Sequence, residues 1–267
     1  MKKRFFALAL AMALVLTIPA VAAQDSVDNF VRSRTYTGQF PDLTAASTFY
    51  DNVTALYEYG LTVGKADGTF GPRDPLTVGQ VVIFAGRIRS LYRTGDAEAG
   101  PGAHQGQPGE ATALRYLRYL QAEGVIGTEF DQLLNTAATR AQVAHVLANT
   151  LPETALPAVN DTLVTQAYAS RKFIPDVTEY TPYYRDILTL YRTGVSIGSD
   201  ATGSYLPGQA ITRGACAAML TRMVDASLRL TPDWDAADAY SAAGTTLASL
   251  VPAGTYISAP STDEEMD

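Results

Sequence analysis

Two apolar patterns alternate along the chain and predict pairs of helices. The first pattern is short and follows i, i+3, i+4 spacing at Val53, Leu56 and Tyr57, which predicts one face of a short helix. Gly60 follows it and suits the left-handed residue that ends a helix. After a loop rich in Gly, Asp and Pro, a longer apolar pattern begins directly behind Thr77. The pattern therefore predicts a helix–loop–helix unit with a longer second helix.

The same unit recurs 134 residues later, with one residue inserted in its loop. The matching segments are 41–44 with 175–178, 60–64 with 194–198, and 76–77 with 211–212. Ordered matches at a nearly constant offset indicate an internal duplication.

A third and weaker copy lies between these two. Gly124–Gly127 and Thr139–Gln142 follow the same order, but this copy lacks the Pro-Asp opening and has a shorter loop. Because one helix pair cannot bury its own apolar face, the three copies should share a core. The sequence therefore predicts a mainly α fold in which three repeats share a central helical bundle.

The remaining segments show weaker patterns. We expect a signal peptide at 1–23, repeats at 40–93, 110–150 and 173–230, a Gly-, Pro- and Ala-rich linker at 94–109, a helical linker at 151–172, a C-terminal helix and extension at 231–258, and an acidic tail at 259–267.

The first residues predict export. A basic start at Lys2–Arg4 precedes an apolar run from Phe5 to Ala22, and small residues follow Pro19. An uncleaved membrane anchor is the alternative, because the run is about 18 residues long. Cleavage after residue 23 would change the formal charge from −7 to −10. Such acidity opposes binding to nucleic acid or to an anionic membrane.

Catalytic and metal-binding patterns are weak. Cys216 is the only cysteine and lies at apolar helical spacing, which predicts a buried thiol. His104 and His145 offer no zinc-ligand spacing, so no cofactor is predicted. Ser196 lies in a Gly-x-Ser-x-Gly match, but a helical pattern precedes it and both histidines come earlier in the chain. We therefore expect a non-enzymatic protein.

The order of these signals resembles the S-layer homology module. The loop at Asp67–Pro72 is nearly the family's Asp-Gly-Thr-Phe-x-Pro, and Thr139–Gln142 differs from its Thr-Arg-Ala-Glu helix start only in the last residue. The resemblance covers about 40–93, 110–150 and 173–230. It implies a three-pronged spindle whose grooves bind secondary cell-wall polysaccharide, often through a terminal pyruvylated sugar. It also implies a protein at the cell wall or cell surface.

The arginine of the helix-start signature is a main ligand contact in that family. By position it is Arg140 in copy two and Arg213 in copy three, whereas copy one has Val78 and should have lost the anion contact. A helix start beside a guanidinium also suits a carboxylate or phosphate. The alternative is a structural salt bridge to Asp42 or Asp176.

Further candidates come from the caps, turns and aromatic residues of the repeats. Turn roles for the aspartates and core packing for the aromatic residues are the alternatives. The predicted glycan-binding residues are Arg140, Arg213, Thr139, Thr212, Asp42, Asp176, Tyr50, Tyr183 and Tyr184. The competing hypothesis for the whole protein is a structural envelope protein that uses the same fold to contact other envelope proteins.

Overall fold

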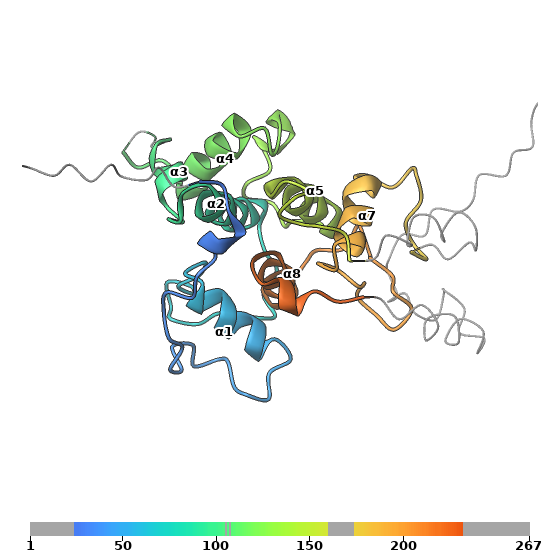
Figure 1. Cartoon of the computed structure of the whole chain (residues 1–267), viewed down its shortest axis with the longest axis horizontal. Helices are drawn as coiled ribbons and strands as arrows, with labels where there is room; N and C mark the ends of the chain where they lie inside the picture. The colour runs from blue at the N-terminus through green and yellow to red at the C-terminus, as the bar shows by residue number, and fades with distance from the viewer. Residues whose placement is uncertain (1–23, 105, 107, 160–173, 232–267) are drawn as a thin grey trace, which may run out of the picture.

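The computed structural model describes residues 24–104, 106, 108–159 and 174–231 (Figure 1). Its helices are α1 (Tyr50–Glu58), α2 (Val78–Thr94), α3 (Ala99–Gly102), α4 (Thr112–Ala122), α5 (Arg140–Thr150), α7 (Tyr184–Arg192) and α8 (Arg213–Val224), with 3-10 turns η1 (Val27–Asn29), η2 (Thr128–Phe130) and η3 (Ala226–Leu228). Extended pairing in these residues is limited to isolated bridges, which confirms the mainly α class. The expected signal peptide, residues 160–172 of the helical linker, residues 232–258 of the C-terminal extension and the acidic tail lie outside the described residues.

The predicted caps form at the start of each second helix. The hydroxyl of Thr77 accepts the Gln80 N–H at 3.3 Å, and the Gln80 amide oxygen accepts the Thr77 N–H at 3.0 Å. Thr139 and Gln142 form the same capping box before α5. Thr212 caps α8 through a single bond, because alanine replaces the glutamine.

The two helices of one copy do not form the main packing pairs. Instead α4 packs against α2, α7 against α5, and α1 against α8 (Figure 1). The first helix of each copy therefore packs on the second helix of the preceding copy, in cyclic order. At the last of these contacts a Cβ atom on Gly214 would overlap the ring of Phe49, so a glycine is needed for this approach.

A closed ring of backbone hydrogen bonds joins the three copies at the residue before each capping threonine. Leu76 N–H donates to Ile211 C=O at 3.0 Å, Ile211 N–H to Ala138 C=O at 3.1 Å, and Ala138 N–H to Leu76 C=O at 2.8 Å. The three positions are equivalent in the repeat. The middle copy therefore takes the same place in the fold as the other two.

The first two amides of each second helix also donate to a loop of another copy. Those of α2 reach Thr136 and Leu134, those of α5 reach Gln209 and Pro207, and those of α8 reach Asp74 and Pro72, all at 2.8–2.9 Å. The capping threonine takes the third amide. The first amides of each second helix are therefore already used, so an anion at these helix starts would meet the guanidinium and not free amides.

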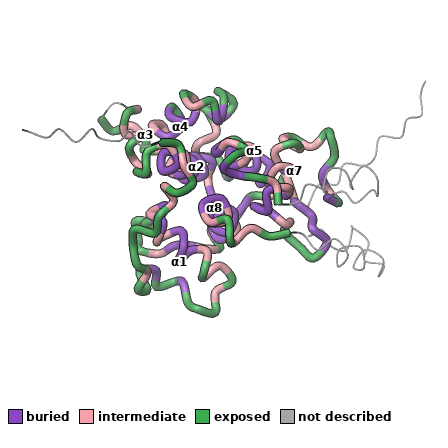
Figure 2. Tube along the Cα trace, in the orientation of Figure 1, coloured by how far each residue is buried: buried purple, intermediate pink, exposed green. Residues whose placement is uncertain are grey.

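The buried residues concentrate on α2, α5 and α8, which Figure 1 shows nearly end-on between the outer helices (Figure 2). Cys216 lies in this core, as predicted, and burial raises the pKa of its thiol to about 12. The 94–109 linker contributes a short helix, α3, and the Glu98 carboxylate beside it accepts hydrogen bonds from Arg87 and Arg115. No helix in the described part of the chain is both long and apolar enough to cross a membrane.

Candidate functional site

Two hollows occupy equivalent places in copies one and three. The repeat-1 groove has a volume of about 330 Å³ and is lined by residues 62–66, Gln80, Ile83, Phe84, Arg87, Thr112 and Arg213. The repeat-3 groove has a volume of about 450 Å³, and its lining includes residues 196–199, Ala215, Ala218, Met219, Arg222, Phe49 and Arg140. Each groove takes side chains from all three copies. Neither groove could therefore form in an isolated repeat.

A buried arginine from a neighbouring copy lies at equivalent positions in the two grooves. In the repeat-1 groove, Arg213 Nε donates to Phe70 C=O at 2.7 Å, and the guanidinium lies 4.8 Å from the centre of the Phe70 ring. In the repeat-3 groove, Arg140 Nε donates to Tyr205 C=O, and the guanidinium lies 4.7 Å from that ring. Arg213 is 5% exposed and Arg140 is 7% exposed. Both signature arginines are thus held in place by their Nε atoms and by an aromatic ring.

Neither of these two arginines forms an ion pair with a described residue. Among the described residues neither Arg140 nor Arg213 has a carboxylate within ion-pair distance, so the alternative salt bridges to Asp42 and Asp176 do not form. Burial lowers the pKa of Arg213, and the nearby thiol and carboxylates, including Asp74, oppose that shift. A buried cation without a paired anion is costly, and a ligand carboxylate would relieve that cost.

A second arginine in each groove was missed at the sequence level. Arg87 Nη1 donates to Leu61 C=O at 3.0 Å, and Arg222 Nη1 donates to Val195 C=O at 3.0 Å. The two arginines are equivalent, because each lies ten residues after its capping threonine. Burial lowers the pKa of Arg222. The sequence signal was present, since the 135-residue offset that matches the second helices also matches these arginines.

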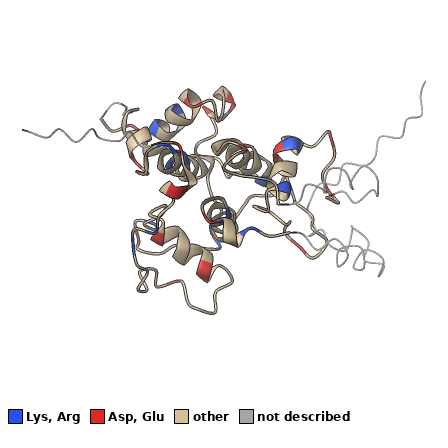
Figure 3. Cartoon of the chain, viewed as in Figure 1, with Lys and Arg blue, Asp and Glu red and all other residues tan. Residues whose placement is uncertain are grey.

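The two grooves differ in whether their cationic side chains are paired with carboxylates of the protein. In the repeat-1 groove, Arg87 Nε lies 3.0 Å from a Glu98 carboxylate oxygen, and Lys65 Nζ lies 2.8 Å from Asp74. In the repeat-3 groove, neutral Ser199 and Gln209 stand where Lys65 and Asp74 stand in copy one. Helix α8, which supplies Arg222, carries two arginines and no acidic residue (Figure 3).

The equivalent place in copy two is closed. Val78 replaces the signature arginine there, and it packs among apolar residues that leave no space for a water molecule. We call this closed place, lined by Val78, Phe130 and Val146, the seam of copy two. His145 stacks on Phe130, which lines the seam, and on Tyr183 at a ring distance of 4.3 Å. Its Nδ1 lies 2.8 Å from Asp186 and its Nε2 lies 3.5 Å from Glu129. The hydrogen bond to Asp186 raises the pKa of His145. At the position where the anion contact was expected to be lost, the space beside Val78 is therefore closed.

The predicted aspartates hold the loops that end at the grooves. The Asp42 carboxylate accepts the N–H groups of Phe70 at 2.8 Å and Gly71 at 2.7 Å. The Asp176 carboxylate accepts those of Tyr205 at 2.7 Å and Leu206 at 2.6 Å. Both aspartates therefore have a structural role, but it differs from the predicted turn role, because each carboxylate binds amides 28–30 residues farther along the chain.

The other predicted residues are distributed over several places. Arg140, Arg213 and Thr212 line the grooves, whereas Thr139 caps α5 outside them. Tyr50 packs edge-on against Tyr36, Tyr183 stacks on His145 in the seam, and the Tyr184 hydroxyl accepts a hydrogen bond from Arg185 Nε. Their assignment as ligand contacts stays a prediction. Two aromatic residues that line the grooves, Phe49 in the repeat-3 groove and Phe84 in the repeat-1 groove, are not among the predicted ligand contacts.

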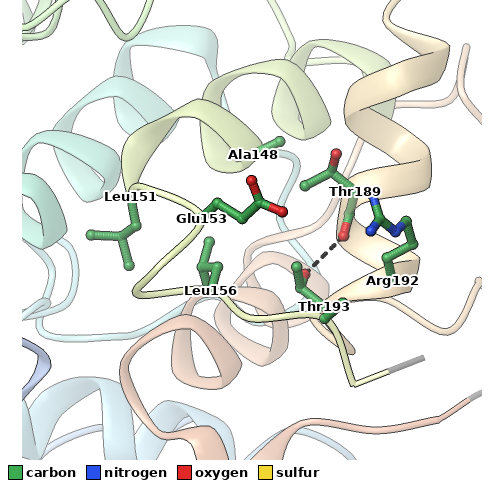
Figure 4. A pocket seen from close by; sticks show the side chains of 8 residues that line it. Ala148, Leu151, Glu153, Leu156, Thr189, Arg192 and Thr193 are labelled. Carbon is green, nitrogen blue, oxygen red and sulfur yellow. Dashed lines mark hydrogen bonds between the residues drawn. The ribbon is translucent and has the colours of Figure 1, made fainter. Parts of the chain in front are cut away.

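A third hollow of about 200 Å³ lies between α5, the segment after it and α7 (Figure 4). Glu153, Thr189 and Arg192 give it polar groups of both signs, and Thr193 Oγ1 donates to Thr189 C=O at 2.9 Å. It shares no lining residue with either groove. We assign it no role.

The serine of the Gly-x-Ser-x-Gly match is part of a repeat turn. Ser196 follows helix α7, its Oγ accepts the Gly198 N–H at 3.3 Å, and it is buried. A nucleophile elbow needs a strand before the serine. In the described ranges no group of three or more His, Cys, Asp or Glu side chains is arranged to hold a metal ion.

Comparison with known families agrees with the duplication. The model of the S-layer homology domain matches residues 39–81 and 173–216, which belong to copies one and three. The middle copy lies outside the match, so its assignment to the family stays a prediction. The comparison with curated proteins gives no match.

Proposed function

Since residues 39–81 and 173–216 of this chain are S-layer homology domains, we propose that the protein anchors itself non-covalently to a bacterial cell wall. Domains of this family are in general cell-wall-anchoring modules. In the finer form of the proposal, the ligand is an anionic secondary cell-wall polysaccharide, with a pyruvylated sugar as one form of its acidic group. The protein acts at the cell surface after export and catalyses no reaction.

One observation carries the glycan assignment. In both grooves a guanidinium is fixed through Nε, and no carboxylate among the described residues pairs with its terminal nitrogens. Two terminal N–H groups held in a plane match the two oxygens of a carboxylate. An acidic sugar entering either groove would therefore meet a preorganised cation. Thr212 at the groove wall, and the loops held by Asp42 and Asp176, would position it.

Co-sedimentation with purified wall sacculi, before and after extraction of the glycan, tests the proposal. The main variant is the double substitution Arg140→Gln, Arg213→Gln, because glutamine removes the charge and keeps an N–H donor for the carbonyl beneath. Arg118→Gln is the matched control, since Arg118 lies on α4 outside the grooves and pairs with Glu110. We expect the double variant to lose at least tenfold in affinity and the control to bind like the wild type.

The outcomes separate the parts of the proposal. Wild-type binding that survives in a folded double variant would show that the two arginines are not the ligand site. Absence of wild-type binding to sacculi would refute wall anchoring itself. Circular dichroism and thermal melting of each variant check that a loss of binding is not a loss of folding.

A second candidate function rests on the closed seam of copy two. Two open grooves beside a closed one suit a structural envelope protein that uses the remaining surface for protein–protein contacts. Binding to sacculi that persists after glycan extraction, and that protease treatment of the sacculi abolishes, would favour this alternative.

A further inference from the structure

The two open grooves differ in charge, and this difference points to different ligands. The inference rests on the proposed glycan binding and goes beyond it, because it concerns which acidic sugars each groove accepts. The repeat-3 groove is also the larger of the two, at about 450 Å³ against about 330 Å³.

Two of the three cations in the repeat-1 groove are already paired with carboxylates. Glu98 pairs with Arg87 at 3.0 Å, and Asp74 pairs with Lys65 at 2.8 Å. A bound anion there would compete with those carboxylates. Arg213 is the one cation of this groove that forms no ion pair with the described residues.

The repeat-3 groove has two arginines, and neither has an ion-pair partner among the described residues. Arg140 and Arg222 both line it, and each donates a hydrogen bond to a backbone carbonyl group, that of Tyr205 or Val195. Ser199 and Gln209 stand in place of Lys65 and Asp74, so the ion pair between those two residues has no counterpart in this groove. Two cations without ion-pair partners in one hollow favour a ligand that brings negative charge to both.

The two arginines reach the groove from different levels of the fold. The Arg140 amide bonds to Gln209 C=O, close to the ring of backbone hydrogen bonds. Arg222 lies ten residues after Thr212 along α8, or roughly 15 Å of helix rise. Its guanidinium reaches the Val195 carbonyl in the turn that forms the other wall of the groove. Acidic groups on two sugar units suit two separate guanidinium groups better than one acidic group does.

We propose that the repeat-3 groove selects an oligosaccharide with acidic groups on two sugar units, and that the repeat-1 groove takes a single acidic group. Arg140 holds one acid near the ring, and Arg222 holds the second acid farther along α8. Such a site binds more tightly at low salt than the repeat-1 groove does, since two unscreened charges contribute.

The test compares defined probes by NMR titration of the full chain at low ionic strength. The probes are galacturonate with one carboxylate, digalacturonate and trigalacturonate with more, and neutral lactose. For the wild type we expect the better of the two oligogalacturonates to bind at least tenfold more tightly than galacturonate. Arg222→Gln should reduce this ratio to below about threefold, whereas Arg87→Gln should change it less, because Glu98 already neutralises Arg87.

A second variant adds a charge without removing a contact. Gln209→Asp places a carboxylate at the position that Asp74 has in copy one, and it should lower the ratio as Arg222→Gln does. A ratio near one in the wild type, no binding of the oligogalacturonates, or a ratio that survives both variants would overturn the inference. If the wild type still sediments with sacculi in that case, the wall-anchoring proposal stands alone; if it does not, both fail.

Discussion

The carboxylate of Asp176 should be one of the largest single contributors to the stability of the copy-three loop. It accepts two backbone N–H groups, from Tyr205 at 2.7 Å and Leu206 at 2.6 Å. Leu206 has φ +59°, which is unfavourable for a non-glycine residue, so the loop depends on such bonds. Asp176→Asn replaces one accepting oxygen with an NH₂ group that faces a backbone donor.

The expected cost follows from these two bonds. A hydrogen bond to a charged group contributes about 1.5–3 kcal/mol, and the variant loses one and weakens the other. We expect the free energy of unfolding to fall by about 2–4 kcal/mol, which is a large share of the roughly 5–15 kcal/mol typical of a domain. For a domain of this size the melting temperature should fall by roughly 5–15 °C.

Urea denaturation followed by circular dichroism at 222 nm measures this loss. Glu179→Gln is the control, because Glu179 is exposed and forms no hydrogen bond or ion pair with the described residues, and it should change stability by less than about 0.5 kcal/mol. An Asp176→Asn protein as stable as this control would refute the reasoning, since the loop amides would then not depend on the carboxylate. Asp42→Asn should behave like Asp176→Asn in copy one.

Three further outcomes follow from the described contacts. Thr139→Ala removes a helix cap and should lower stability by about 0.5–2 kcal/mol in urea denaturation, with no change in m-value. The hydrogen bond to Asp186 raises the pKa of His145 above its unfolded value of about 6.5. The contribution of His145 to folding stability is therefore complete below pH of about 6.5 and is lost as pH rises through the folded pKa. Melting temperatures measured from pH 5 to 9 should fall accordingly, and His145→Gln should weaken this pH dependence. Burial raises the pKa of Cys216 to about 12, so Ellman's reagent at pH 8 should label the thiol only after unfolding.

The sequence was sufficient to predict the individual helices, but it did not predict which helices pack against each other. Apolar spacing located α1 and α7, and the Thr-x-x-Gln pattern located the starts of α2 and α5, because these signals lie within a few residues of each other. The cyclic pairing of helices was not predictable, since it joins residues far apart in the chain. Arg213, for example, bonds to a carbonyl 143 residues earlier.

For the candidate site, the sequence likewise predicted individual residues but not their contacts with other copies. Motif matching found Arg140 and Arg213, but it could not show that an aromatic ring and a carbonyl from another copy hold them. Capping explained Thr139, but the use of the next two amides by a neighbouring loop depends on tertiary packing. Arg87 and Arg222 could have been found by extending the repeat comparison to the end of the second helices.

The hydrogen-bonded ring through Leu76, Ala138 and Ile211 has a consequence for how such a chain can change over generations. In an open array of repeats, each unit contacts only its neighbours, so units can be gained or lost at the ends. A closed ring has no end. Deleting the middle copy would leave a donor and an acceptor of the ring without partners and would expose the first amides of α2, and a fourth copy would have no place to enter. Copy number is therefore fixed, and a copy whose groove has closed is still retained because the other two need it to fold.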